Sequence, residues 1–198
     1  METDRQLSRA VAATATVSVD GRYYRFASQR RISAGLNGST AGGRWGPKDG
    51  FPVLYLTDDY DGCVIEAYRH VTDPAIDNGP KKISFGLLTC DVQASNILDL
   101  TRAGARMGLG LEPAILYSEP QPTDGAAYAA CIRIAQIAHQ LGRHGILVPA
   151  ATQKGHTLAL FMDLLPDSEH PVRVGPVTSW LELPADPRRL RLISREEP

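Results

Sequence analysis

The sequence predicts an α+β fold with mainly antiparallel strand pairing. Short apolar runs that are typical of strands recur along the 198-residue chain, whereas only two segments have a convincing helical pattern. The runs also lack the regular strand–helix alternation of a parallel sheet. The length suits one domain, and an apolar fraction of 43% is sufficient for a core. We therefore expect a single domain, residues 1–198, whose core spans about residues 23–183.

The first part of the chain predicts a helix, a strand and a long loop. Residues 3–16 are Ala-rich and weakly helical, so the N-terminal segment 1–16 is expected to be a docked helix. Residues 17–26 predict a strand, with Asp20-Gly21 forming a turn before it. Residues 34–50 contain six glycines, which exclude a regular element. Arg44-Trp45 lies in the middle of this loop and indicates that the loop is ordered, because a tryptophan is normally packed.

A short strand and a helix follow the loop. Residues 52–57 (PVLYLT) predict the strand, and Asp58-Asp59 provides the N-cap and the acidic first turn of a helix that reaches Val71. Glu66 lies beside the apolar stripe of this helix. Thr72-Asp73-Pro74 is expected to end it, because proline cannot continue a helix.

The second half of the chain predicts several strands around one long helix. The helix covers residues 125–142, begins after Thr123-Asp124 and ends at Gly142. A brief helix over 101–107 and a loop over 108–121 precede it. Strands are predicted at residues 82–92, 97–100, 145–150, 157–164, 172–183 (interrupted at Gly175-Pro176) and, at an edge, 190–193.

Composition excludes several classes of protein. A net charge of -1 argues against a broad nucleic-acid-binding surface. The three cysteines are widely spaced and are expected to be reduced and buried, and the histidines lack metal-ligand spacing, so no metal site is expected. The N-terminus lacks a signal-peptide pattern, and no apolar run approaches the ~20 residues of a membrane span, so we expect a cytoplasmic protein without membrane contact.

The glycine-rich loop has none of the common nucleotide-binding or hydrolase signatures. The patterns GxxxxGK[ST], GxGxxG and GxSxG are absent, which disfavours a P-loop enzyme, a Rossmann dehydrogenase and a serine hydrolase. Gly43 nevertheless permits close backbone approach, and the guanidinium groups of Arg44 and Arg25 match phosphate oxygens. Together they predict a pyrophosphate site, although a lone arginine is more often part of a surface ion pair.

Two further residues are candidates for the chemistry. Glu66 is able to hydrogen-bond a ribose and stabilise an oxocarbenium-like transition state, although a charged residue beside an apolar stripe is usually only solvated. Tyr55 is able to stack on a nicotinamide ring or hold a ribose, although its ordinary role is that of a core or edge aromatic. Both residues become stronger candidates because they belong to a longer series of motifs.

The order of several short motifs resembles the RES-domain family. The motifs are Tyr24-Arg25-Phe26, Gly42-Gly43-Arg44-Trp45, Val53-Leu54-Tyr55-Leu56, Glu66 and the GILVPAA run at 145–151, so the resemblance covers about residues 23–160. It implies a fold similar to ADP-ribosyltransferase toxins and an NAD⁺-consuming toxin of a bacterial toxin–antitoxin pair. It also implies an Xre-like antitoxin that occludes the active site. By matching position, Glu66, Arg25 and Tyr55 would be catalytic, and Gly43 and Arg44 would join them in binding NAD⁺.

The chain departs from this family where a serine is expected. Ala129 occupies the expected position on the long helix, and Ala150 replaces a second serine in the late strand. Either another hydroxyl such as that of Thr123 substitutes, or this member works without one. Three functions therefore remain: transfer of ADP-ribose to phosphate or water, transfer to a cellular protein, and nucleotide or antitoxin binding without catalysis. The run around Glu66 lacks a second glutamate of the ExE type, which favours a small acceptor.

Overall fold

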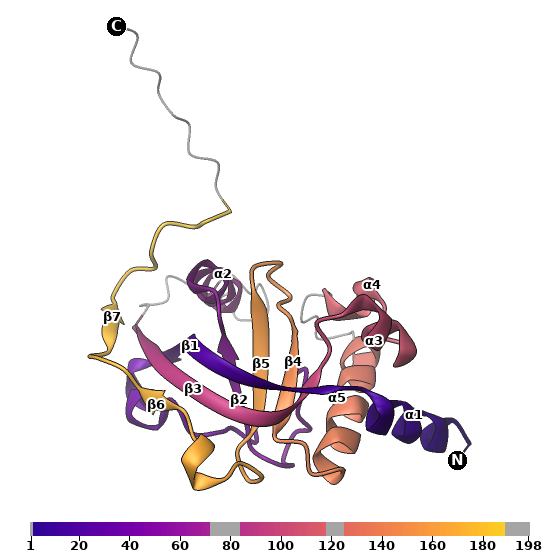
Figure 1. Cartoon of the computed structure of the whole chain (residues 1–198). Coiled ribbons are helices and arrows are strands. Elements are labelled where there is room, and N and C mark those ends of the chain that lie inside the picture. The colour runs from indigo at the N-terminus through magenta and orange to yellow at the C-terminus, as the bar shows by residue number, and fades with distance from the viewer. Residues whose placement is uncertain (1, 72–83, 118–124, 189–198) are drawn as a thin grey trace, which may run out of the picture.

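The computed structural model describes residues 2–71, 84–117 and 125–188, and its centre is one seven-stranded sheet (Figure 1). The strands follow the order β1-β2-β5-β4-β3-β6, and β7 also pairs with β3. Because β1 pairs with β3 as well as with β2, the sheet curls until its path closes on itself. The strands are β1 (Thr16–Ser28), β2 (Val53–Thr57), β3 (Phe85–Asp99), β4 (Gly145–Pro149), β5 (His156–Phe161), β6 (Val172–Arg173) and β7 (Thr178–Trp180).

Helices lie around this sheet in the described part of the chain. They are α1 (Glu2–Ala13), α2 (Tyr60–Val71), α3 (Ala103–Gly108), α4 (Pro113–Leu116) and α5 (Gly125–Gln140), with 3-10 turns at η1 (Gln29–Ala34) and η3 (Asp167–Glu169). Between the described strands, β3 and β4 pair in parallel and the other pairings are antiparallel. The predicted α+β class with mainly antiparallel pairing is therefore confirmed.

Local signals in the sequence explain where α2 begins and where α5 ends. Asp59 Oδ1 accepts a hydrogen bond from the Gly62 amide at 2.7 Å, so Asp59 caps α2 as expected. Gly142 follows α5 with φ of +70°, and its amide donates to the His139 carbonyl. Glycine adopts this left-handed conformation without strain, which allows the helix to stop there.

Two predictions about strands are wrong. Asp20-Gly21 does not form a turn, because both residues lie inside β1, opposite Gln93 and Val92 of β3. Residues 85–92 and 97–99 belong to one strand, β3, rather than to two. The register shifts between Val17 and Val19 of β1, which leaves Ser95 and Asn96 of β3 between the paired residues, and Asn96 adopts φ of +55° there. Continuous pairing with β1 thus overrides the local turn and loop signals.

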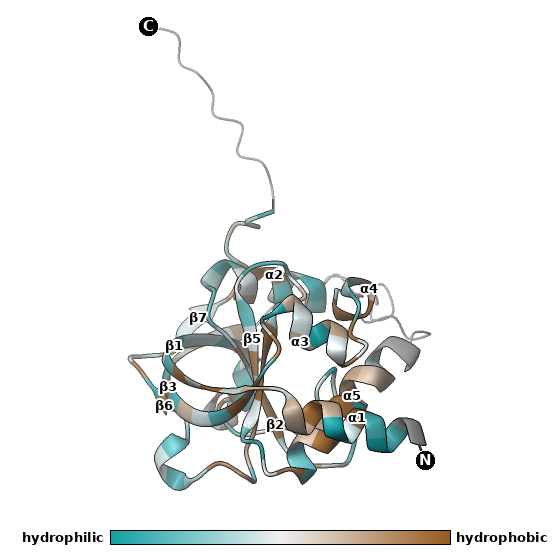
Figure 2. Cartoon of the chain, turned by 45° about the vertical axis from the view of Figure 1, so that its right-hand side comes forward, coloured by the Kyte–Doolittle hydropathy of each residue, from teal (hydrophilic) through white to brown (hydrophobic). Residues whose placement is uncertain are grey.

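The core has three clusters of buried side chains. The largest lies between the sheet and α5 and includes Val11 of α1 and Trp45 of the glycine-rich loop. A second cluster joins side chains of β1, β2, β3 and β5, among them Leu54 and Leu158, and a third lies under α2. Figure 2 shows the apolar residues concentrated on α5 and the central strands. The glycine-rich loop is therefore anchored in the core through Trp45, as its sequence predicts.

Some predicted features fall outside the described residues. These are the helix end at Thr72-Asp73-Pro74, the cap at Thr123-Asp124, the first residues of the strand predicted from 82, and the edge strand at 190–193. The short helices η1 and α4 were not predicted. Among the described helices, none is long and apolar enough to cross a membrane.

Candidate active site

A cleft of about 450 Å³ contains all five residues that the sequence singles out. They are Arg25, Gly43, Arg44, Tyr55 and Glu66. They come from β1, the glycine-rich loop, β2 and α2, so the fold brings together segments that are well separated along the chain. Figure 1 shows α2 and α4 at the same end of the sheet, with the loop between β4 and β5 between them.

Arg25 and Tyr55 lie where the two strands meet. Arg25 Nη1 donates a hydrogen bond to the Tyr55 carbonyl oxygen at 3.0 Å, which fixes the guanidinium group against β2. Burial lowers the pKa of Arg25 below its ordinary value of 12.5, the Cys63, Cys90 and Tyr55 side chains opposing this shift. Arg25 Nε is buried and has no hydrogen-bond acceptor among the described residues. A buried guanidinium donor without an acceptor is suited to an anionic or hydroxyl-bearing ligand.

The glycine-rich loop packs directly on the Tyr55 phenol. Tyr55 Oη accepts a hydrogen bond from the Trp45 amide at 3.0 Å. A Cβ atom on Gly43 would lie 2.7 Å from the same oxygen, so only glycine permits this approach. Burial raises the pKa of Tyr55 to about 12, more than the Trp45 amide and the nearby arginines lower it. The phenol is therefore neutral near pH 7, and the loop and β2 form one rigid wall.

Arg44 points from this loop toward the helices on the other side of the cleft. Its Nη1 donates to the Ile115 carbonyl of α4 at 2.7 Å, and its guanidinium carbon lies 4.5 Å from the ring centroid of Tyr128 on α5. Cation–π contact and a backbone hydrogen bond hold the planar group in one orientation. Tyr128 is not identifiable as a site residue from the sequence, because one tyrosine among alanines carries no signal of its own.

One face of α2 lines the cleft with five residues, namely Gly62, Cys63, Glu66, Arg69 and His70. The side chain of Glu66 is 52% exposed and its Oε2 lies 3.7 Å from Arg69 Nη1. Arg69 is less exposed, at 19%, and its Nη2 donates to the Ala151 carbonyl at 3.2 Å. Arg69 is thus a third arginine in the site, which the sequence analysis did not identify.

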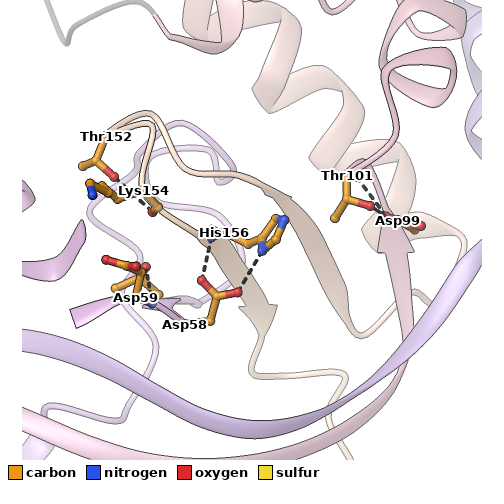
Figure 3. A network of polar contacts seen from close by, with 8 residues as sticks. Asp58, Asp59, Asp99, Thr101, Thr152, Lys154 and His156 are labelled. Atoms are coloured by element: carbon orange, nitrogen blue, oxygen red, sulfur yellow. Dashed lines mark hydrogen bonds and ion pairs between the residues drawn. The ribbon is translucent and has the colours of Figure 1, made fainter. Parts of the chain in front are cut away.

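The turn between β4 and β5 lies against the start of α2, and Figure 3 shows Thr152, Lys154 and His156 near Asp58 and Asp59. Asp58 accepts hydrogen bonds from the His156 amide at 2.6 Å and interacts with His156 Nδ1 at 2.8 Å. Gly155 has φ of +61°, and a side chain there would collide with Asp58 and Asp59. The same turn carries Thr152, which lines the cleft. The contacts with Asp58 and Asp59 therefore fix the backbone of this turn to the start of α2.

The position expected for the family serine does not face the cleft. Ala129 is exposed on α5 and is not among the described cleft residues, whereas its neighbour Tyr128 is. Ala150 does line the cleft, without a hydroxyl. Threonine hydroxyls are available instead from Thr57, Thr152 and Thr157, and Thr123 lies outside the described residues.

The cysteines and the carboxylates give no further chemistry within the described residues. The three thiols are free and buried, as predicted, and burial raises the pKa of Cys63 to about 12. A buried thiol with such a pKa is a poor nucleophile near neutral pH. The described part of the chain contains no group of three or more His, Cys, Asp or Glu residues placed to hold a metal ion.

Comparison with known proteins connects this site to a family. The family model named RES domain matches residues 19–185. NAD(+) phosphorylase MbcT of Mycobacterium tuberculosis is 31% identical over 151 residues, which cover 75% of this chain and 77% of that protein. A second M. tuberculosis protein, named "Probable NAD(+) phosphorylase Rv3189", is 27% identical over 167 residues, or 83% and 75% of the two chains.

A solved structure shares both the fold and the extent of the chain. It is the M. tuberculosis MbcT–MbcA toxin–antitoxin complex, which matches with a TM-score of 0.71 and 26% identity over 88% of this chain and 91% of that chain. The resemblance noted in the sequence is thus supported by a family model, by relatives and by a structure. The chain belongs to the RES domain family.

Proposed function

We propose that this protein is the toxin of a toxin–antitoxin pair and cleaves NAD⁺ at its nicotinamide–ribose bond by phosphorolysis. The observation that carries the proposal is the gathering of Arg25, Arg44, Tyr55 and Glu66 in one cleft. Its volume of about 450 Å³ is within the usual range for a small-molecule site. The similarity to proteins named NAD(+) phosphorylase supports the substrate and the acceptor.

The arginines bind the diphosphate of NAD⁺ in this proposal. Arg44 is held between the Ile115 carbonyl and the Tyr128 ring, and Arg25 is held by the Tyr55 carbonyl, so both guanidinium groups are oriented before the ligand enters. Preorganised donors lose little conformational entropy on binding. Gly43 and Trp45 keep the Tyr55 phenol in place, where it contacts the nicotinamide riboside.

Glu66 supplies the electrostatic contribution to bond cleavage. As the glycosidic bond breaks, positive charge develops on the ribose, and a nearby carboxylate stabilises that charge. The side chain of Glu66 is half exposed, so water screens its charge before NAD⁺ binds. Bound NAD⁺ displaces this water and strengthens the interaction at the step where it is needed. Nicotinamide then leaves as a neutral molecule with the electron pair of the broken bond.

A small acceptor is favoured over a protein acceptor. Glu66 is followed along α2 by Ala67, Tyr68 and Arg69, and no second carboxylate is among the described cleft residues. Protein transfer remains the alternative for the same site, and a domain that binds without catalysis is the second alternative. We further propose that an antitoxin covers the cleft and inhibits the enzyme, by analogy with the MbcT–MbcA complex.

Product analysis with purified protein tests these alternatives. We expect release of nicotinamide from NAD⁺ together with ADP-ribose-1-phosphate in phosphate buffer, and loss of release in Glu66→Gln by about 100- to 1,000-fold. Glu182→Gln is the matched control, since Glu182 is exposed and is not among the cleft residues. Labelled protein bands in a cell extract would instead support protein transfer. Absence of nicotinamide under every condition would refute both enzymatic readings.

A further inference from the structure

The described lining of the cleft has more positive charge than NAD⁺ has net negative charge. Arg25 and Arg44 provide two guanidinium groups for a diphosphate that carries two negative charges, whereas Arg69 adds a third. Glu66 is the one acidic residue among the described residues of this lining, so three arginines and one glutamate leave a net charge of +2. NAD⁺ carries one net negative charge, because its cationic nicotinamide ring offsets one of the two diphosphate charges. The site is therefore suited to hold a second anion beside NAD⁺.

Arg69 lies beside Glu66, the carboxylate assigned above to the breaking bond. The acceptor forms its bond at the ribose carbon that Glu66 stabilises, so it has to approach that carboxylate closely. Two like charges a few ångströms apart repel each other, and the repulsion is strong in a site from which water is excluded. Arg69 Nη1 is 3.7 Å from Glu66 Oε2, so its charge offsets this repulsion at the required place.

The surroundings of Arg69 form a prearranged binding position. The Ala151 carbonyl fixes its guanidinium at 3.2 Å, and the next residue in the chain is Thr152. The Thr152 hydroxyl lies over the first turn of α2, because a Cβ atom on Gly62 would be 3.4 Å from its Oγ1. That hydroxyl donates to the Lys154 carbonyl at 3.4 Å, a long hydrogen bond that is easily exchanged for one to a ligand.

We propose that Arg69 and Thr152 bind the inorganic phosphate that accepts ADP-ribose. This inference rests on the proposed function. In the reaction, the bond between nicotinamide nitrogen and ribose breaks and its electron pair leaves with nicotinamide. An oxygen of HPO₄²⁻ forms the new bond to the same carbon, the phosphate proton stays on the product, and no net proton is released. Arg69 and Thr152 orient the phosphate for this attack, and Thr152 takes the place of the hydroxyl that Ala129 and Ala150 lack.

Steady-state kinetics of Arg69→Gln and Thr152→Val test the assignment, with both NAD⁺ and phosphate varied. We expect Arg69→Gln to raise KM for phosphate by at least about 10-fold, as for loss of a charge-assisted contact, with KM for NAD⁺ within about twofold. Thr152→Val keeps the shape of the side chain and should raise KM for phosphate by about 2- to 10-fold. Arg69→Lys keeps the charge without the planar fork and should fall between wild type and Arg69→Gln.

The control is Arg22→Gln, because Arg22 is exposed on β1, pairs with Asp91 and is not among the cleft residues. An equal rise in KM for NAD⁺ and phosphate would overturn the assignment and place Arg69 at the diphosphate. An unchanged KM for phosphate in both variants would also overturn the assignment, whether or not nicotinamide release in the absence of phosphate becomes slower. If thermal melting shows that Arg69→Gln is not folded, the KM of Thr152→Val for phosphate decides whether the assignment holds. A wild-type protein without a phosphate-dependent product would refute the proposed function itself, before any variant is compared.

Discussion

Gly43 is the residue through which the glycine-rich loop packs on Tyr55 of the cleft. Its Cα position leaves no room for a side chain, because a Cβ atom would lie 2.7 Å from Tyr55 Oη. Gly43→Ala must therefore move either the loop that carries Arg44 or the phenol. We expect the rate of nicotinamide release to fall by about 10- to 100-fold, since displacements of about 1 Å in an active site have effects of this size.

The matched control for this substitution is Gly21→Ala. Gly21 lies in β1, and a Cβ atom there meets nothing within 4 Å. Its rate should equal that of wild type, and both proteins should give the same circular dichroism spectrum. A Gly43→Ala variant with full activity would show that Tyr55 and the loop are not held together as the structure indicates.

The residues of the candidate site differed in how far the sequence could identify them. Arg44 lies in a loop whose clustered glycines exclude a regular element, so the sequence alone indicates a binding role for it. Arg69 was not visible, because its place depends on the Ala151 carbonyl, which is 82 residues away in the chain. Spacing along α2 does put Arg69 on the face of Glu66, but many surface helices pair a glutamate and an arginine in this way. The β4–β5 turn lies against this face of α2 in the folded protein, and this contact makes the face part of a cleft instead of an exposed surface.

At the scale of elements, the β4–β5 turn is held to α2 by backbone conformation as well as by Asp58 and His156. Gly155→Ala should destabilise the protein for two reasons, the positive φ of +61° and the collision with Asp58 and Asp59. Gly175→Ala should be affected only by its positive φ of +70°, because a Cβ atom at this position would meet nothing within 4 Å. We expect the Tm of Gly155→Ala to be lower than that of Gly175→Ala by at least about 2 °C. Equal melting temperatures would show that the turn is not packed on α2.

A second element, η3, is tied to the sheet through Glu169. This carboxylate accepts hydrogen bonds from the Ser95 amide and hydroxyl at 3.1 and 2.6 Å, and it lies 2.8 Å from His144 Nδ1. Burial raises its pKa, but the Ser95 and His144 contacts together outweigh burial, so the pKa is below the ordinary value of 4.5. The stabilisation is present at neutral pH and is lost as the pH falls through the lowered pKa.

Glu169→Gln measures this contribution. We expect a loss of about 1–3 kcal/mol in the free energy of unfolding at pH 7, as for hydrogen bonds to a charged group. The difference from wild type should shrink as the pH falls below 4.5, because wild-type Glu169 is then increasingly protonated. Urea unfolding at several pH values provides the measurement, with Asp167→Asn on the exposed side of η3 as control. A difference that stays constant down to acid pH would contradict the role of the carboxylate charge.

Element types were easier to predict than element limits. Residues 52–57 and 145–150 are apolar runs bounded by turn residues, and both form strands. In β1 and β3, the predicted turn at Asp20-Gly21 and the predicted break between residues 92 and 97 are both absent, because the two long strands pair over most of their length. Cross-strand pairing depends on residues about 70 positions away, as for Tyr23 and Cys90. A single sequence carries no direct record of such a register.

For the whole molecule, closure of the sheet decides where the cleft lies. The pairing of β1 with both β2 and β3 brings Arg25 beside Tyr55, whereas a flat sheet with β1 at an edge would leave Arg25 near solvent. The sequence predicted the class of fold but not this closure, because closure follows from twist accumulated over several strands. The site is therefore a property of the curled sheet together with the elements at its end.

The N-terminal helix is the last part of the molecule whose contribution can be measured separately. It precedes residues 19–185, over which the family model matches, yet Val11 is fully buried in the cluster that also contains Trp45. Val11→Ala removes two methyl groups from this cluster and should cost about 2 kcal/mol in unfolding free energy. The Tm should then fall by about 4–8 °C, with nicotinamide release at 25 °C unchanged per folded molecule. Arg5→Ala on the exposed side of α1 is the control, and an unchanged Tm in Val11→Ala would show that α1 does not stabilise the core.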